Sequence, residues 1–222
     1  SRFIAAMERM NPEIVPELAW QMGRPVRYGG ELRSLAERVN AMIDIAPDAL
    51  ARVGQADRFV ERTPAGLVLV IAPWNYPFLT AANTIVPALI GGNAVLLKHA
   101  AQTLLAGERF AEALGAAGLP EGLFHNLFLS HDRTARLLGS GTMDHATFTG
   151  SVEAGRAIER AAAGSFTTLT LELGGKDPAY VREDADLAEG DLARSSRRGV
   201  GLEDVGEHVA DDGAVLHGEA GE

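Results

Sequence analysis

Residues 72–77, APWNYP, place an asparagine between two prolines directly after an apolar run. Pro73 and Pro77 restrict the backbone, so the side chain of Asn75 acts from a fixed position. A rigid amide at the end of a strand is a suitable donor to an oxyanion that develops during acyl chemistry. An asparagine can equally cap the helix that we expect from Phe78, and these residues alone favour the cap.

A single glutamate, Glu172, follows the apolar residues 169–171 and precedes Gly174 and Gly175. A carboxylate is costly to bury without a purpose, and desolvation at the end of an apolar strand would suit it to general-base work. The alternative is a glutamate that faces solvent at the end of a strand. The residues alone support both interpretations equally.

Two further segments have the composition of anion sites. Residues 148–155, FTGSVEAG, combine a strand end, a Gly-Ser turn and a helix start, where free N–H groups and the dipole attract anions. Ser151 would then be both the N-cap and a phosphate ligand. In residues 91–99, GGNAVLLKH, Lys98 ends a strand and could bind a ribose or phosphate, or it could simply face solvent. Each signal is weak alone, because the G-x-G-x-x-G fingerprint of dinucleotide sites is absent.

Alternating strand and helix patterns must position these motifs. Apolar runs predict strands at 67–72, 93–97, 124–129, 145–148, 168–172 and 178–181, and helical periodicity predicts helices at 78–90, 101–117, 132–138 and 151–163. Strands rich in Val, Leu and Ile with helices between them predict an open, mostly parallel α/β sheet that is covered on both faces. Such sheets bind ligands at the carboxyl ends of their strands, where all four motifs lie.

The segment before this sheet is predicted to be helical. Apolar residues recur at helical spacing from Ile4 to Met22, and residues 23–25, GRP, end the pattern. A second helical stretch starts near Glu31. Alternation at 58–62 and the turn residues that follow it predict a hairpin near 58–70.

Composition excludes several classes of function. The 222 residues carry a formal net charge of −10 and no cysteine. The charge argues against a nucleic-acid partner, and without thiolates we expect neither disulfides nor a metal site. We see no targeting segment and therefore expect a cytoplasmic protein. Residues 66–97 carry no charged side chain, but Pro73, Pro77 and Pro87 argue against a membrane-spanning helix.

The four motifs APWNYP, GGNAVLLK, FTGSVEAG and LELGGKDP, in this order, resemble those of the aldehyde dehydrogenase superfamily from about Glu17 to about Leu187. The resemblance implies a Rossmann-like sheet with N-terminal helices and a small oligomerisation hairpin, an NAD or NADP cofactor, an aldehyde substrate and a homo-oligomeric parent. It makes Asn75 the oxyanion donor and Glu172 the general base that activates water. It places the cofactor against Ile71, Trp74, Lys98, Gly150, Ser151, Gly155 and Leu173, with Lys98 on the adenosine ribose, Ser151 on the pyrophosphate and the Leu173 backbone on the nicotinamide.

The chemistry of that family needs a cysteine thiolate that attacks the aldehyde carbon, and the resemblance implies a position near Gly206. The chain has no cysteine there or elsewhere. We expect residues 1–189 to form the helices and the cofactor-binding domain, with the catalytic domain absent. We expect residues 190–222 to be an unstructured tail, as a frameshift would produce. Three hypotheses stay open: a truncated dehydrogenase, an inactive fragment that binds a cofactor or a partner, and a vestige that barely folds.

The resemblance also bears on the choice of cofactor and substrate. Many NAD-preferring members have an acidic residue three positions after the strand-end lysine, and here that position is Ala101. Nothing at this position would repel a 2′-phosphate, so we expect NADP to be accepted at least as well as NAD. Residues 97–100, LKHA, resemble the branch that includes succinate-semialdehyde dehydrogenases, but the pattern does not specify the aldehyde.

Overall fold

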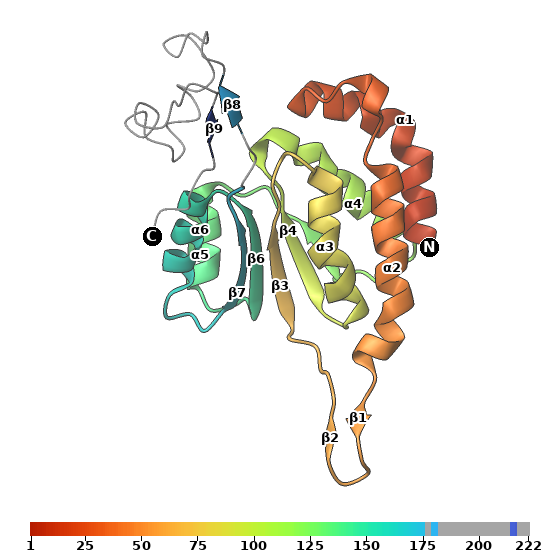
Figure 1. The fold of residues 1–222 in the computed structure, drawn as a ribbon. Coiled ribbons are helices and arrows are strands. Elements are labelled where there is room, and N and C mark those ends of the chain that lie inside the picture. Colours follow the sequence, from red (N-terminus) through yellow and green to blue (C-terminus); the bar gives the residue numbers. More distant parts are fainter. Residues whose placement is uncertain (176–178, 182–213, 217–222) are drawn as a thin grey trace. The chain divides into compact units, whose positions relative to one another are not determined.

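A computed structural model describes residues 1–175, 179–181 and 214–216 of the chain. The chain divides into two compact units, Ser1–Leu173 and Gly174–Glu222. The first unit is a five-stranded parallel sheet with helices on both faces (Figure 1), as the sequence predicted. The predicted domain boundary after Glu189 lies outside the described residues.

The order of the strands creates a natural ligand site. The strands are β3 (Leu67–Ile71), β4 (Ala94–Lys98), β5 (Phe124–Asn126), β6 (His145–Gly150) and β7 (Thr168–Leu173), and they lie side by side in the order β5-β4-β3-β6-β7. From β3 the chain first builds outward to β5 and then returns to the other side of β3 with β6. The direction in which successive strands are added to the sheet therefore reverses between β3 and β6. Parallel sheets bind ligands beyond the carboxyl ends of the strands at such a switch point.

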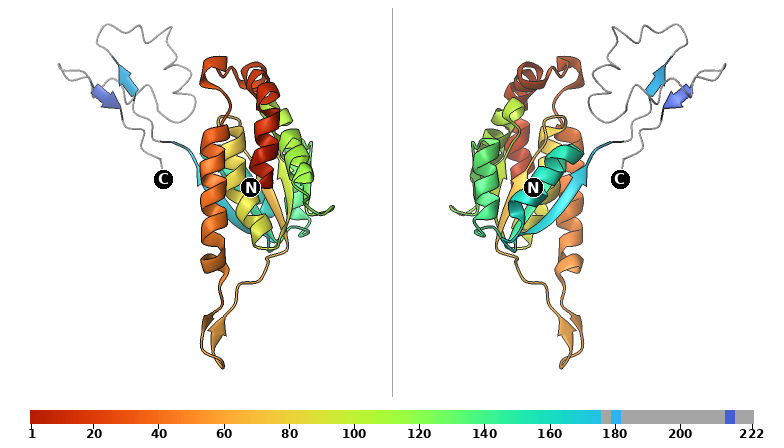
Figure 2. Two further views of the ribbon diagram at one scale, coloured as in Figure 1. Left: turned by 90° about the vertical axis from the view of Figure 1, so that its right-hand side faces the viewer. Right: turned by 90° about the vertical axis from the view of Figure 1, so that its left-hand side faces the viewer.

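Both faces of the sheet are covered (Figures 1 and 2). On one side lie α1 (Arg2–Met22), α2 (Leu32–Leu50), α3 (Pro77–Ile90) and α4 (Leu104–Ala116), and on the other lie α5 (His131–Gly139) and α6 (Val152–Ala162). Successive residues of β3 pack alternately against the two helix layers. Val68 and Val70 belong to the core under α1–α4, whereas Leu69 and Ile71 belong to the core under α5 and α6. Burial on both faces explains why this strand is a continuous apolar run rather than an alternating one.

Several helices begin or end at the capping and helix-breaking residues that the sequence showed. Gly23 ends α1 in the left-handed conformation with φ of 73°, which glycine adopts without steric cost. A short 3-10 turn, η1 (Val26–Tyr28), then leads to α2. The predicted helix at 101–117 is split into a 3-10 turn, η2 (Ala101–Thr103), and α4. Strand β5 is shorter than the predicted 124–129, since the chain turns towards α5, which is capped by Ser130.

The hairpin lies earlier than the sequence predicted. Its strands, β1 (Val53–Gly54) and β2 (Phe59–Val60), pair antiparallel. The predicted bounds of 58–70 are wrong because residues 67–71 form β3, which pairs in parallel with β4 and β6. Gly54 permits the tight approach: a Cβ there would collide with the backbone of the opposite strand. The hairpin projects from the end of the sheet where β3 begins (Figures 1 and 2).

The second unit has two described strands. β8 (Ala179–Val181) pairs antiparallel with β9 (Ala214–Leu216). The prediction of a strand at 178–181 within the parallel sheet is therefore wrong in its partner, because β8 pairs with β9. Of the predicted unstructured tail, residues 214–216 form β9 and the others lie outside the described residues. Within the described part of the chain, no helix is long and apolar enough to cross a membrane.

Candidate functional site

The last residues of four neighbouring strands lie in a row along one edge of the sheet. Ile71 at the end of β3 is paired in register with Lys98 at the end of β4, and on its other side with Phe148 of β6. Gly150 at the end of β6 is paired with Leu173 at the end of β7. Four of the residues predicted to contact a cofactor are thus brought together at the switch point, although up to 102 positions separate them in the sequence (173 − 71).

Lys98 is buried at this edge, with only 6% of its surface exposed. The alternative of a solvent-facing lysine is therefore wrong. Desolvation lowers the pKa of Lys98, and none of the ion pairs found among the described residues includes it. A buried ammonium without a counter-ion is costly, and an anionic or hydroxyl-rich ligand at the edge would offset that cost.

Ser151 caps α6 as the sequence predicted. Its Oγ accepts a hydrogen bond of 3.2 Å from the backbone N–H of Ala154, and the side chain is exposed. The first N–H groups of a helix have no partner within that helix, and they are directed away from its N-terminus. This start of α6 follows β6 directly at the switch point, so it presents donors where the sheet favours a ligand. Glu153 in the first turn adds a negative charge beside these donors.

The two flanking glycines have a packing role that the sequence did not reveal. A Cβ on Gly155 would overlap the side chain of Leu173, so its absence lets α6 approach the end of β7. A Cβ on Gly150 would lie 2.5 Å from the ring of Phe148. In both places the glycine lets a neighbouring side chain occupy the space beside the backbone. The FTGSVEAG motif therefore fixes the shape of the edge as well as its donors.

Asn75 does not cap α3, contrary to the alternative that its residue type favoured. The N-cap position is Tyr76, which makes no side-chain capping bond. Glu31 supplies the cap instead, because its Oε2 accepts 2.7 Å from the N–H of Leu79. Asn75 is exposed, and no hydrogen bond of its side chain is found among the described residues. Its amide is thus available to a ligand, beside the half-exposed ring of Trp74.

Glu172 is exposed, so the desolvation that the sequence suggested is absent. The reason is the position of β7 at the border of the sheet, where β6 is its only partner strand among the described residues. Glu172 is in register with Thr149, one residue before the end of β6. The strand ends that carry Asn75 and Glu172 are separated by β6, which is two strand spacings, or roughly 10 Å. Both residues thus follow or end strands at the same edge of the sheet.

Sequence reasoning missed a buried histidine beside Lys98. His99 is 1% exposed, and its Nε2 lies 3.0 Å from the carbonyl oxygen of Pro77. Its Nδ1 lies 3.0 Å from the N–H of Ala100 and 3.0 Å from Oγ1 of Thr103. A carbonyl can only accept and a backbone N–H can only donate, so the ring is the neutral tautomer with its proton on Nε2. Burial lowers the pKa of His99. A polar residue directly after a buried strand was the available signal.

No group of three or more His, Asp or Glu side chains able to hold a metal ion is found within the described ranges. The site at the sheet edge offers backbone donors, the buried Lys98 and the exposed Glu172. Such a set suits an anionic organic ligand better than a metal.

Residues 1–194 match the family model described as the aldehyde dehydrogenase family. The chain belongs to the aldehyde dehydrogenase family. It is 38% identical over 140 residues to a probable succinate-semialdehyde dehydrogenase [NADP(+)] of Synechocystis, covering 63% of this chain and 31% of that protein. It is 34% identical to geranial dehydrogenase of Castellaniella defragrans, covering 84% of this chain and 40% of that protein. The chain thus spans only about a third to two fifths of the length of these relatives.

Solved structures agree with this membership. Lactaldehyde dehydrogenase of Escherichia coli superposes with a TM-score of 0.72 at 28% identity, over 79% of this chain and 38% of that protein. Succinic semialdehyde dehydrogenase of Streptococcus pyogenes, solved in complex with NADP+, shares the fold with a TM-score of 0.70 at 24% identity, over 79% of this chain and 40% of that protein. The family and the Rossmann-like fold that the motifs predicted are both confirmed.

Proposed function

We propose that this chain is the NAD(P)-binding part of an aldehyde dehydrogenase that, as a whole protein, oxidises an aldehyde to a carboxylic acid. The observation that carries the proposal is that the buried Lys98 and the capped N-terminus of α6 lie at the ends of the two strands that flank β3, namely β4 and β6, at the same edge of the sheet. A buried cation and free backbone donors at one edge, two strand spacings or roughly 10 Å apart, match the phosphates and hydroxyls of a dinucleotide.

The residues present fit such a cofactor. Ser151 and the first N–H groups of α6 would bind the pyrophosphate, and Lys98 would bind the adenosine ribose. Ile71 and the half-exposed Trp74 would line the site, and the backbone of Leu173 would meet the nicotinamide. Gly150 and Gly155 would keep the edge narrow through their packing on Phe148 and Leu173. When bound, the nicotinamide accepts the hydride that leaves the substrate.

Two side chains have the chemistry for the acyl steps. The Asn75 amide, unoccupied by any helix cap, would donate to the oxyanion on the substrate carbon. The Glu172 carboxylate would take a proton from the water that releases the acid. The attacking thiolate of the family requires a cysteine, and none of these 222 residues is one. We therefore expect this chain by itself to bind the cofactor without oxidising an aldehyde.

Two finer features follow from the relatives and the hairpin. A curated relative is named for succinate semialdehyde and for NADP(+), which supports NADP and an acidic aldehyde as cofactor and substrate of the whole enzyme. The hairpin exposes Val53, Phe59 and Val60. An apolar, projecting element of this kind supports a homo-oligomer as the working assembly.

A second candidate is a fragment that binds a cofactor or a partner and does no chemistry. The absence of cysteine favours it, as does the exposure of Glu172. The two candidates share the cofactor site and differ only in what the remaining length of the protein supplies.

Calorimetric titration of the full chain with NAD+ and with NADP+ tests the shared site. We expect Ser151→Ala and Lys98→Met each to weaken binding roughly tenfold, which corresponds to about 1.4 kcal/mol. Ser130→Ala is the matched control, because Ser130 caps α5 with the same geometry, accepting 3.3 Å from Arg133. No binding at millimolar cofactor, or equal losses in the Ser130 and Ser151 variants, would overturn the proposal.

A further inference from the structure

We propose that Glu31 is a positioning residue for the loop that carries Asn75, because its carboxylate caps α3 from a neighbouring helix. The inference rests on the proposed function only in giving Asn75 its role at the oxyanion. The contact itself is independent of that role. Glu31 lies directly before α2, and it is joined to a segment 48 residues away in the chain.

Glu31 replaces the local cap that α3 lacks. The helix begins at Pro77, which has no N–H, and its N-cap Tyr76 makes no side-chain bond. The Oε2 of Glu31 accepts 2.7 Å from the N–H of Leu79, and the nearby backbone of Phe78 also favours the charged carboxylate by lowering its pKa. These are the N–H groups that an ordinary N-cap side chain would bind. An ionised acceptor at this end also interacts favourably with the helix dipole.

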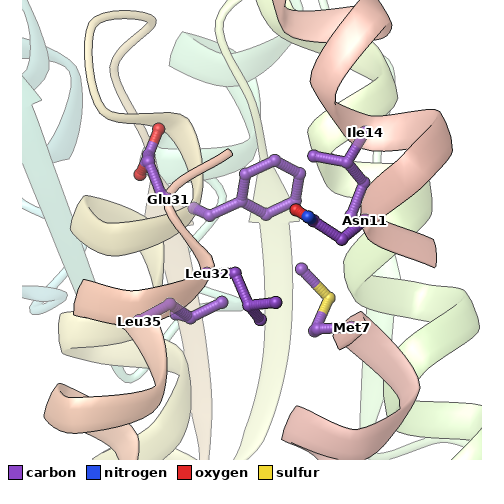
Figure 3. A pocket seen from close by; sticks show the side chains of 7 residues that line it. Met7, Asn11, Ile14, Glu31, Leu32 and Leu35 are labelled. Carbon is purple, nitrogen blue, oxygen red and sulfur yellow. The ribbon is translucent and has the colours of Figure 1, made fainter. Parts of the chain in front are cut away.

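The carboxylate performs this task from inside the protein. Glu31 is 5% exposed and borders a small cavity that is otherwise lined by Met7, Asn11, Ile14, Leu32, Leu35 and Phe78 (Figure 3). Desolvation raises the pKa of Glu31, while its bond to Leu79, the charge of Arg24 and the backbone of Phe78 oppose that rise. Its second oxygen, Oε1, has no hydrogen-bond partner among the described residues. Burying a charged carboxylate costs free energy. The hydrogen bond to α3 is the contact that offsets this cost.

The capped turn is one of two anchors of the Asn75 loop. At the other end, the N–H of Ala72 donates 3.1 Å to the carbonyl oxygen of Lys98, directly after β3. Only residues 73–76 lie between these anchors, and Pro73 and Pro77 limit their backbone freedom. If the first turn of α3 frays, the bond from His99 to the carbonyl oxygen of Pro77 is the contact that still holds this end of the loop, and the Asn75 amide is held less firmly. This follows from the shortness of the segment rather than from any contact between Glu31 and Asn75.

Amide hydrogen exchange of the full chain tests this arrangement, with Glu31→Leu and Glu31→Gln compared with the wild type. The leucine variant removes the acceptor, and we expect exchange of the Leu79 amide, and of the Thr80 amide that bonds to Tyr76 in the same turn, to accelerate roughly tenfold or more. The glutamine variant keeps an oxygen that can accept, so it should restore most of the protection. Glu37→Gln, at an exposed glutamate of α2, is the matched control and should change nothing.

Two results would overturn the proposal. One is unchanged exchange at residues 74–80 in the leucine variant. The other is a uniform acceleration across α1, α2 and α4, which would mean that Glu31 supports only global stability. Cofactor titration of the wild type is a separate readout. If the wild type binds no cofactor but the exchange pattern is as expected, the proposed function fails while the positioning role stands.

Discussion

The Nε2–H of His99 donates a 3.0 Å hydrogen bond to the carbonyl oxygen of Pro77, so the residue after β4 is joined to the first residue of α3. On the other side of the ring, Nδ1 accepts from the N–H of Ala100. Protonation would place an Nδ1–H against that N–H group, and the buried ring has little access to water that could compensate. The fold at the site therefore requires the neutral imidazole.

This requirement predicts a pH dependence of stability. Burial lowers the pKa of His99 in the folded state below its ordinary value of 6.5. Below that value the unfolded chain binds more protons than the folded chain, so the free energy of unfolding falls as the pH decreases from about 6.5. Urea unfolding between pH 8 and pH 5 should show this loss in the wild type and a flatter dependence in His99→Gln.

Other groups contribute to the same curve and must be subtracted. His145, which is half-buried and also has a lowered pKa, acts with the same sign. Glu31 acts with the opposite sign, since its raised pKa lets the folded state take up a proton first as the pH falls. The decisive quantity is the difference between wild type and His99→Gln, with His145→Gln as the control. Parallel curves for wild type and His99→Gln would contradict the prediction.

The ion pairs of Arg109 are expected to hold α4 on α1. Its guanidinium contacts Glu13 and Glu112, each at 2.8 Å, and also Glu17, and only 17% of the side chain is exposed. The Glu17 and Glu112 carboxylates raise the pKa of Arg109, so its guanidinium stays charged at every practical pH. We expect Arg109→Met to lower the free energy of unfolding by about 2 kcal/mol, because it leaves the partly buried Glu17 unpaired.

The matched control is Arg33→Met on α2. Arg33 pairs with Glu37 at 3.1 Å, but the two side chains are 92% and 66% exposed. Exposed pairs contribute about 0–1 kcal/mol, so this variant should unfold nearly as the wild type does. Equal losses in the two variants would show that the Arg109 ion pairs add nothing beyond an ordinary surface pair.

Phe166 is a position where a substitution should stabilise the protein. It has a φ of 62°, which a bulky residue seldom adopts, and its side chain is 97% exposed, so it buries almost no surface. Phe166→Gly and Phe166→Asn should raise the free energy of unfolding by about 1 kcal/mol, because strain is removed without loss of packing. Phe128→Asn, at an exposed phenylalanine without a positive φ, should give no gain. A lower free energy of unfolding in both Phe166 variants would instead indicate that the ring makes a stabilising contact.

Local patterns predicted the elements well, because the signals for a helix or a buried strand lie within a few residues. Val68 and Leu69 face opposite helix layers, and the continuous apolar run predicted that. The motifs then predicted which strand ends would carry the site, and the pairing of Ile71 with Lys98 brings two of those ends together. The family resemblance supplied the roles, which spacing alone could not.

Several of the misses depend on strand order or on distant partners. Glu172 is exposed because β7 borders the sheet, and no local pattern states which strand is at the border. Asn75 was favoured as a helix cap because the actual cap, Glu31, precedes α3 by more than forty residues. The hairpin bounds failed because β1 and β2 have only two residues each, too few to give a clear alternating pattern. The first two features depend on contacts between segments that are far apart in the sequence.

Cofactor preference provides the last prediction, which rests on the proposed cofactor site. Ala101 begins η2, three residues after Lys98, and its side chain is exposed. A carboxylate introduced by Ala101→Glu would repel the 2′-phosphate of NADP+ and could accept from the ribose hydroxyls of NAD+. We expect the Kd for NADP+ to rise roughly tenfold, about 1.4 kcal/mol, while the Kd for NAD+ stays the same or falls. Ala101→Gln separates charge from size, and titration at low and high salt separates repulsion from steric effects, since only the former is screened. If the glutamate and glutamine variants share one ratio of NADP+ to NAD+ affinity, residue 101 does not face the ribose, and the preference must arise elsewhere on the edge.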